Sequence, residues 1–209
     1  MGNFFNLDAP IWAWISEITD VIILSCLWWL CCIPIVTIGA STTAFFYVMG
    51  KKIRKENHYI LKDFFKSFKE NFKQSLLPAI LMIVANFSMI LYILMSIEGL
   101  RVGNVHLKWL LPITIIFIFE FINIFTYLWA ILSRFNMKTK QLLKAAILMP
   151  HKHLFTTLGN TCAFIISGLL IYHIPFLIVF VPGIVITLSS VLMQSLFERY
   201  IIGETVQNS

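Results

Sequence analysis

The sequence is short of charged residues, and those it has are missing from four long stretches. Only 12% of its 209 residues are Asp, Glu, Lys or Arg. The runs 21–50, 75–97, 109–133 and 154–197 contain no Asp, Lys or Arg, and Glu120 is their single acidic residue. A bilayer's hydrocarbon core of about 30 Å needs roughly 20 apolar residues in a helix. These runs therefore place the chain in a membrane and exclude an ordinary soluble domain.

The sequence also lacks the short motifs of common catalytic and nucleotide-binding sites. It contains no Walker, zinc-protease, Gly-x-Ser-x-Gly or dinucleotide-binding glycine pattern. Inside the apolar runs Glu120 has no second acid or base beside it in the sequence. His151 and His153 do not share a helix face, and no further metal ligand stands near them. We therefore predict no enzyme, no metal site and no cofactor.

Cysteine is scarce and gives no disulfide framework. Cys26, Cys31, Cys32 and Cys162 all lie in apolar runs, where cysteine packs as a small hydrophobic residue. A redox role for the adjacent pair is the alternative, which we disfavour because adjacent cysteines bridge only with strain. The first twenty residues contain no Lys or Arg, unlike a cleaved signal peptide.

The runs predict an all-α fold, a polytopic transmembrane helix bundle in a single integral membrane domain over residues 1–209. The last run is long enough for two spans and breaks at Pro175, since proline disfavours helix at the residue before it. Pro182-Gly183 is expected to kink the second of these spans. The five predicted spans lie near residues 18–38, 76–97, 109–133, 154–173 and 176–197.

Basic residues concentrate in two connections between the spans. Residues 51–73 contain eight Lys or Arg and residues 134–152 contain five, whereas the first twenty residues contain none. Because basic connections stay on the cytoplasmic side, we predict a cytoplasmic carboxyl terminus and an outside amino terminus. The net charge of +6 then indicates contact with anionic lipid headgroups and not with nucleic acid.

The two basic connections are predicted to contain amphipathic helices on the membrane surface. In the first, aromatic residues recur at helical spacing while lysines fill another stripe. Leu142-Leu143-Lys144 repeats this pattern weakly in the second, which leaves an internal duplication open. The predicted surface for lipid or a partner consists of Lys62, Phe65, Lys66, Phe68, Lys69, Phe72 and Lys73.

Polar side chains form two stripes inside the predicted spans. An intramembrane carboxyl is a candidate functional group, and low dielectric favours its neutral form, so we expect Glu120 to face the bundle interior. The alternative is a structural role in hydrogen bonding between helices. The third-span stripe is Glu120, Asn123 and Tyr127, the fifth-span stripe is Thr187, Ser190 and Gln194, and Asn86 and Asn160 are further candidates.

The first apolar run is too long for one straight crossing, because its 30 residues would measure about 45 Å as a helix. Pro34 and Gly39 predict a break between them, since proline lacks an N–H and glycine adds backbone freedom. Thr37, Ser41 and Thr42 are placed to satisfy the freed backbone groups. The break is either a simple kink or an unwound ion-binding segment of the kind found in transporters.

Several strings together resemble the YesL family of bacterial membrane proteins. They are Asp8-Ala9-Pro10, Leu27-Trp28-Trp29-Leu30, the stretch 31–41 and the stretch 64–74. The resemblance is specific over residues 4–78 and looser beyond. It implies a multi-pass protein of the bacterial cell membrane. Family members often accompany genes for oligosaccharide uptake and breakdown in Firmicutes, so it also implies carbohydrate utilisation, but no catalytic or ligand residues.

The expected function is an accessory or regulatory component of carbohydrate uptake or sensing. Its expected partner is a carbohydrate ABC transporter permease or a sensor kinase. The alternative is a small transporter or channel subunit with a polar site around Glu120. A continuous polar path along Glu120 and the fifth-span stripe would favour transport, and burial of these residues in tight pairs would favour the accessory role. The oligomeric state stays open.

Overall fold

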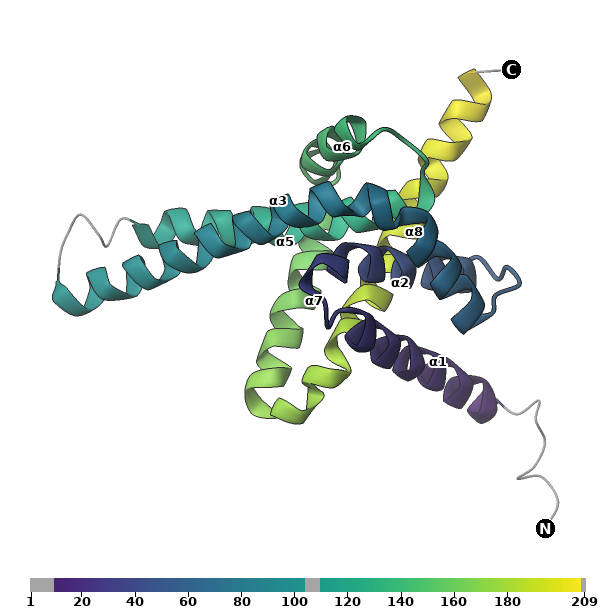
Figure 1. Ribbon diagram of the computed structural model, residues 1–209, viewed down its shortest axis with the longest axis horizontal. Coiled ribbons are helices and arrows are strands. Elements are labelled where there is room, and N and C mark those ends of the chain that lie inside the picture. The colour runs from purple at the N-terminus through teal and green to yellow at the C-terminus, as the bar shows by residue number, and fades with distance from the viewer. Residues whose placement is uncertain (1–9, 104–109, 208–209) are drawn as a thin grey trace, which may run out of the picture.

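The computed structural model describes residues 10–103 and 110–207, and this part of the chain forms helices and turns without any strand (Figure 1). The all-α prediction is therefore confirmed for it. Asp8, Ala9 and Trp109, which were named above, lie outside the described residues. In chain order the elements are α1 (Pro10–Cys31), η1 (Ile35–Thr37), α2 (Ile38–Ile53), α3 (Ile60–Val102), α5 (Leu110–Arg134), α6 (Thr139–Lys152), α7 (Leu154–His173), η2 (Pro175–Val179) and α8 (Val181–Gln207).

Within the described residues, four helices are long and apolar enough to cross a bilayer, namely α3, α5, α7 and α8. Two of the predicted spans, 109–133 and 154–173, correspond closely to α5 and α7. The protein is thus a helical membrane bundle, as its charge distribution indicated.

The predicted first span over residues 18–38 is wrong. α1 ends at Cys31 and α2 begins at Ile38, with Pro34 in the turn between them. The Lys52 Nζ, near the end of α2, lies 2.6 Å from an Asp20 carboxylate oxygen and 3.2 Å from one of Glu17. The two helices therefore fold back as an antiparallel pair, which we call the α1–α2 hairpin. The hairpin thus brings Glu17 and Asp20, which precede the first apolar run, beside Lys52, which follows it.

Threonine side chains close the turn of this hairpin. The Thr37 hydroxyl donates to the backbone carbonyl of Cys31, at the end of α1, and to that of Pro34, which also accepts the Thr37 backbone N–H. Across the hairpin, the Trp28 Nε1 donates to the Thr42 Oγ1 at 3.0 Å. Backbone groups at membrane depth need such partners, because lipid supplies none. Thr37 thus has its predicted role, whereas the Ser41 hydroxyl is buried without a partner among the described residues.

The predicted surface helix and the span 76–97 form one continuous helix, α3, which is 43 residues long and contains Pro78. The prediction of a separate interfacial helix there is wrong. Phe64 is fully buried in the core, Phe68 stacks on it, and Phe72 contacts Phe68 at a tilted angle one turn further along the helix. These aromatics cover protein and not lipid, because α2 packs along the start of α3. The exposed members of the predicted surface are Lys62, Phe65, Lys66, Lys69 and Lys73.

The second basic connection contains α6, which is amphipathic as predicted. Leu142 and Ala146 are buried, whereas Lys140 and Lys144 are exposed. α6 packs alongside α5. Its apolar face therefore rests on protein.

The last predicted span, 176–197, begins later than expected. The chain passes through η2, and α8 starts at Val181, so Pro182 lies in its first turn and does not kink it. Gly183 lies where α8 crosses α1: a Cβ there would stand 2.1 Å from the Ser25 Oγ. The glycine is needed for close packing between helices.

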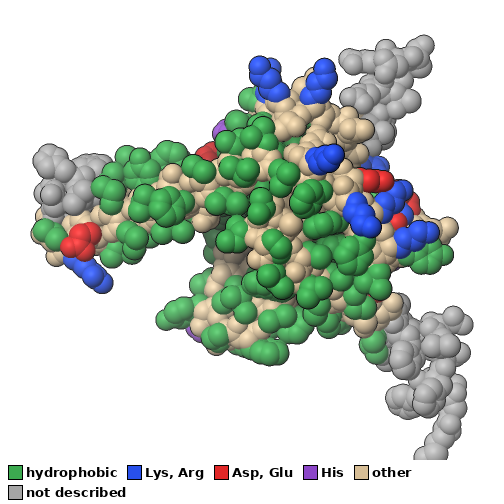
Figure 2. Space-filling model, viewed as in Figure 1, with side chains coloured by type: hydrophobic (Ala, Val, Ile, Leu, Met, Phe, Trp, Pro, Cys, Tyr) green, Lys and Arg blue, Asp and Glu red, His purple; other side chains and the backbone are tan. Residues whose placement is uncertain are grey.

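Two helical arms diverge from a shared core (Figure 1). One arm is α3 with α5, and the other is α7 with α8. The arms are covered by hydrophobic side chains, while Lys and Arg gather near α6 and the α2–α3 connection (Figure 2). In the most apolar stretch of 18 residues of α3, only 6% of the residues are buried, whereas 50% are buried in the corresponding stretch of α8. The apolar surface of the first arm therefore faces outward, as lipid exposure requires.

Candidate functional site

Polar side chains join α5 to α7 inside the bundle. Asn123 and Tyr127 are fully buried. The Asn123 Nδ2 donates to the Thr161 Oγ1 at 3.0 Å, and the Tyr127 hydroxyl lies 3.2 Å from the Thr157 Oγ1. Such bonds hold transmembrane helices together, at about 0.6–2 kcal/mol each. These two members of the predicted stripe therefore form interhelical pairs.

Glu120 does not share their interior position, so the prediction that it faces the bundle interior is wrong. Its side chain is 31% exposed, and its Oε1 lies 3.3 Å from the Nε2 of His151. The reason is that α6 folds back along α5 and carries His151 to the level of Glu120. The partner of Glu120 thus lies on the connecting helix α6 and not within a span.

The stripe on α8 follows a different course. Ser190 donates to the Ile186 carbonyl of its own helix, and the Gln194 amide contacts Arg54 and Glu198. The Thr187 hydroxyl is buried with no hydrogen-bond partner among the described residues. Since Asn123 and Tyr127 bond to α7, the structure does not bring the two predicted stripes together.

The two asparagines named as further candidates lie in different surroundings. Asn160 on α7 is fully buried, and neither atom of its amide has a hydrogen-bond partner among the described residues. Asn86 lines a largely apolar cleft of about 390 Å³ between α3, α5, α7 and the start of α2. This volume falls within the range of small-molecule pockets, which runs from about 300 to 1,000 Å³.

Gly39 lies at this cleft with a role that differs from the predicted one. It is in the first turn of α2, and a Cβ on it would stand 2.5 Å from the Cη2 of Trp129. Trp129 is 1% exposed, so its ring has little room to move away. Gly39 therefore permits close contact between α2 and α5 and does not loosen the backbone.

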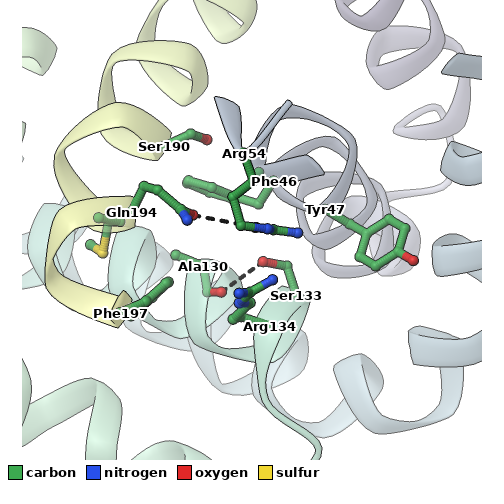
Figure 3. Close-up of a pocket in the computed structure, with 11 residues that line it drawn as sticks. Phe46, Tyr47, Arg54, Ala130, Ser133, Arg134, Ser190, Gln194 and Phe197 are labelled. Atoms are coloured by element: carbon green, nitrogen blue, oxygen red, sulfur yellow. Dashed lines mark hydrogen bonds between the residues drawn. The ribbon is translucent and has the colours of Figure 1, made fainter. Parts of the chain in front are cut away.

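A second, polar pocket lies where the ends of α2 and α5 meet the middle of α8 (Figure 3). Arg54 at the end of α2 and Arg134 at the end of α5 both point into it, and Gln194 approaches from α8. Its lining residues are Phe46, Tyr47, Gly50, Arg54, Ala130, Ser133, Arg134, Ser190, Met193, Gln194 and Phe197. We call this the arginine pocket.

Arg54 is held firmly in the arginine pocket. Its Nε and Nη2 donate to the two carboxylate oxygens of Glu56, at 2.6 and 3.2 Å, and its Nη1 donates to the Gln194 Oε1 at 3.3 Å. A Cβ on Gly50 would lie 3.0 Å from this Nη1, so the glycine leaves room for the guanidinium. The hydrogen bond from Arg54, with the nearby charges of Arg134 and Lys51, holds the pKa of Glu56 below its usual value.

Arg134 differs from Arg54 in lacking a partner. Among residues 15–103 and 110–200, no hydrogen bond or ion pair reaches its guanidinium, although Glu56 and Glu198 lie within electrostatic range. The cavity measures about 20 Å³, which is room for about one water molecule. A sugar ring does not fit inside it.

Sequence reasoning missed the arginine pocket because Arg54 and Arg134 counted only as topology signals. One sequence feature could have indicated the pocket. Gly50 lies four residues before Arg54, so on a helix it leaves space beside the arginine side chain.

A family model described as "Protein of unknown function, DUF624" matches residues 21–95, from the second half of α1 to most of α3. No curated protein and no solved structure matches significantly. The match covers α2 and the second half of α1 and includes Arg54, but it ends before Arg134.

Proposed function

We propose that this protein is an accessory or regulatory membrane component and not a transporter by itself. The observation that supports this proposal is the pairing of Asn123 with Thr161 and of Tyr127 with Thr157, which uses the polar groups of α5 for helix packing. Glu120 lies apart from them beside His151, and the stripe on α8 turns toward Arg54. A continuous polar path through these residues would have supported transport instead.

The carbohydrate part of the proposal rests on resemblance. DUF624 is the domain of YesL-type proteins, and the match overlaps the strings that resemble this family. We infer a bacterial cell membrane location and a partner in sugar uptake or sensing, either an ABC transporter permease or a sensor kinase. The exposed lysines of α3 suit anionic headgroups at that membrane's surface.

The first test is crosslinking in native membranes combined with a flux assay. A photo-reactive residue is placed at Phe87 on α3 or at Ile166 on α7, both of which are exposed. We expect one position to capture a sugar permease or a histidine kinase. Oligosaccharide flux by the purified protein alone in liposomes would overturn the accessory role and favour the alternative of a small transporter or channel subunit.

We also propose that both described ends of the chain lie on the cytoplasmic side. The ion pairs of Lys52 with Asp20 and Glu17 put the middle of α1 beside the basic connection. Between Ile38 and Lys51, α2 measures about 20 Å, which is less than the hydrocarbon core of about 30 Å. The α1–α2 hairpin would then enter and leave on one side, and four crossings by α3, α5, α7 and α8 return the chain to it.

Cysteine labelling tests this topology. In a variant without native cysteines, single cysteines replace Ser16, Lys69 and Gly103, which are all exposed. We expect a membrane-impermeant reagent added outside intact cells to label position 103 alone, and to label 16 and 69 only after the cytoplasmic face is opened. Labelling of position 16 from outside would instead support a single membrane crossing by the first apolar run.

A further inference from the structure

We propose that Arg134, with Arg54 beside it, binds a phosphate group in the arginine pocket. The phosphate belongs either to an anionic lipid headgroup or to a soluble phosphorylated molecule. This inference does not depend on the accessory role proposed above, because it rests on the pocket alone.

The hydrogen bonds in the pocket leave one guanidinium available. Arg54 uses Nε, Nη1 and Nη2 on Glu56 and Gln194, so its guanidinium is fixed in place and its charge is largely balanced by Glu56. Arg134 retains its side-chain N–H donors, with no acceptor among the described residues. The planar guanidinium matches the geometry of phosphate, which it binds through two parallel hydrogen bonds.

The acidic groups around the pocket do not take the place of the phosphate. Glu56 is engaged by Arg54, and the Glu198 carboxylate accepts from the Gln194 amide at 3.0 Å. Neither carboxylate approaches Arg134 within 4.0 Å in the described structure. The two serine hydroxyls of the pocket are also occupied, since Ser133 and Ser190 donate to carbonyls of their own helices.

The size and position of the pocket favour the end of a larger molecule. Its volume of about 20 Å³ accommodates one oxygen atom, so the rest of the phosphate would remain at the mouth. Arg134 directly follows the apolar run 109–133, and Arg54 follows the run 21–50 by four residues. Residues at this height meet the phosphate layer of a bilayer, which borders its hydrocarbon core.

The test measures lipid retention on the purified full-length protein by native mass spectrometry. Phosphatidylglycerol in detergent micelles is the probe, and phosphatidylcholine is the zwitterionic comparison. We expect Arg134→Gln to weaken phosphatidylglycerol binding about 10- to 100-fold, which corresponds to the loss of a charge-assisted hydrogen bond or pair. The matched control Lys144→Gln removes the same charge from an exposed position on α6 and should leave binding unchanged.

Two further variants guard against a folding defect. Arg134→Lys keeps the positive charge but loses the planar guanidinium with its paired N–H donors, so we expect weaker phosphatidylglycerol binding with unchanged thermal stability. Gly50→Ala should displace the Arg54 guanidinium and also weaken binding, because its new Cβ would meet Nη1 at 3.0 Å.

Inorganic phosphate distinguishes the two sources. Displacement of bound lipid by millimolar phosphate, or a rise in Tm with phosphate that Arg134→Gln abolishes, assigns the site to a soluble phosphorylated molecule. Lipid retention that phosphate does not affect, and that Arg134→Gln abolishes, assigns it to a headgroup. Equal binding of every probe by the parent protein, Arg134→Gln and Lys144→Gln would overturn the proposal.

Discussion

Gly39→Val is expected to destabilise the protein by about 3 kcal/mol, because its new side-chain atoms would overlap the ring of Trp129. Its Cβ would lie 2.5 Å from the Trp129 Cη2 and 2.8 Å from the Cζ3. The indole is 1% exposed and lines the cleft beside Gly39, so either its ring must shift toward the cleft or α2 must move away from α5. A lower Tm in detergent, with loss of the compact species in size-exclusion chromatography, is the measurement.

Gly168→Val is the matched control for this prediction. It introduces the same β-branched side chain into a helix, but a Cβ at Gly168 would meet no atom within 4 Å. Both variants therefore replace a helical glycine by valine, but only Gly39→Val brings the new side chain into contact with Trp129. Equal stability of the two variants would contradict the contact between α2 and α5.

A second change at Trp129 sharpens the comparison. In Gly39→Val with Trp129→Leu, the smaller side chain leaves room for the valine. The double variant should then lose less stability than the sum of the two single variants. Additive losses would indicate that the clash does not occur at Trp129.

The sequence predicted the crossings best where a local signal marks each end of the helix. α7 begins and ends at the predicted residues 154 and 173. His153 and Pro175 flank it, and both are local signals. The carboxyl-terminal end of α5 was predicted in the same way, from the charge of Arg134. Composition and local chain chemistry suffice for such elements.

The α1–α2 hairpin was not predictable in the same way. Its evidence is an ion pair between Asp20 and Lys52, and the positive-inside rule does not take such pairs into account. The glycines at positions 39 and 183 serve contacts with Trp129 and Ser25, which are distant in sequence. Local reasoning gave each glycine a backbone role, because the partner helix was unknown.

In the candidate site, too, local sequence predicts the kind of contact but not the partner. The polarity of Asn123 and Tyr127 predicted interhelical bonding, but only the fold identifies α7 as the partner. The partner of Glu120 proved to be His151, on a connecting helix outside the spans. Arg54 and Arg134 are 80 positions apart, and their shared pocket exists only once α2 and α5 end at the same level.

Lys52→Glu is expected to destabilise the protein by about 2–4 kcal/mol, because it replaces two attractions with two repulsions at a site largely removed from water. The Lys52 side chain is only 9% exposed, and Asp20 is 18% exposed. Glu17 contributes less, since its side chain is 62% exposed and screened by solvent. Thermal unfolding of the detergent-solubilised protein measures the loss, and Lys69→Glu on the exposed face of α3 is the matched charge reversal.

Asp20→Lys in the Lys52→Glu background should recover part of this loss, because it restores opposite charges across the α1–α2 hairpin. In the antiparallel arrangement the two side chains are 2.6 Å apart, so the double-variant cycle must show a coupling energy. In a single crossing by the first apolar run they would be separated by a hydrocarbon core of about 30 Å, and no coupling would arise. Additive effects of the two substitutions would therefore reject the hairpin, whereas recovery specific to Asp20→Lys requires α1 and α2 to return to the same side.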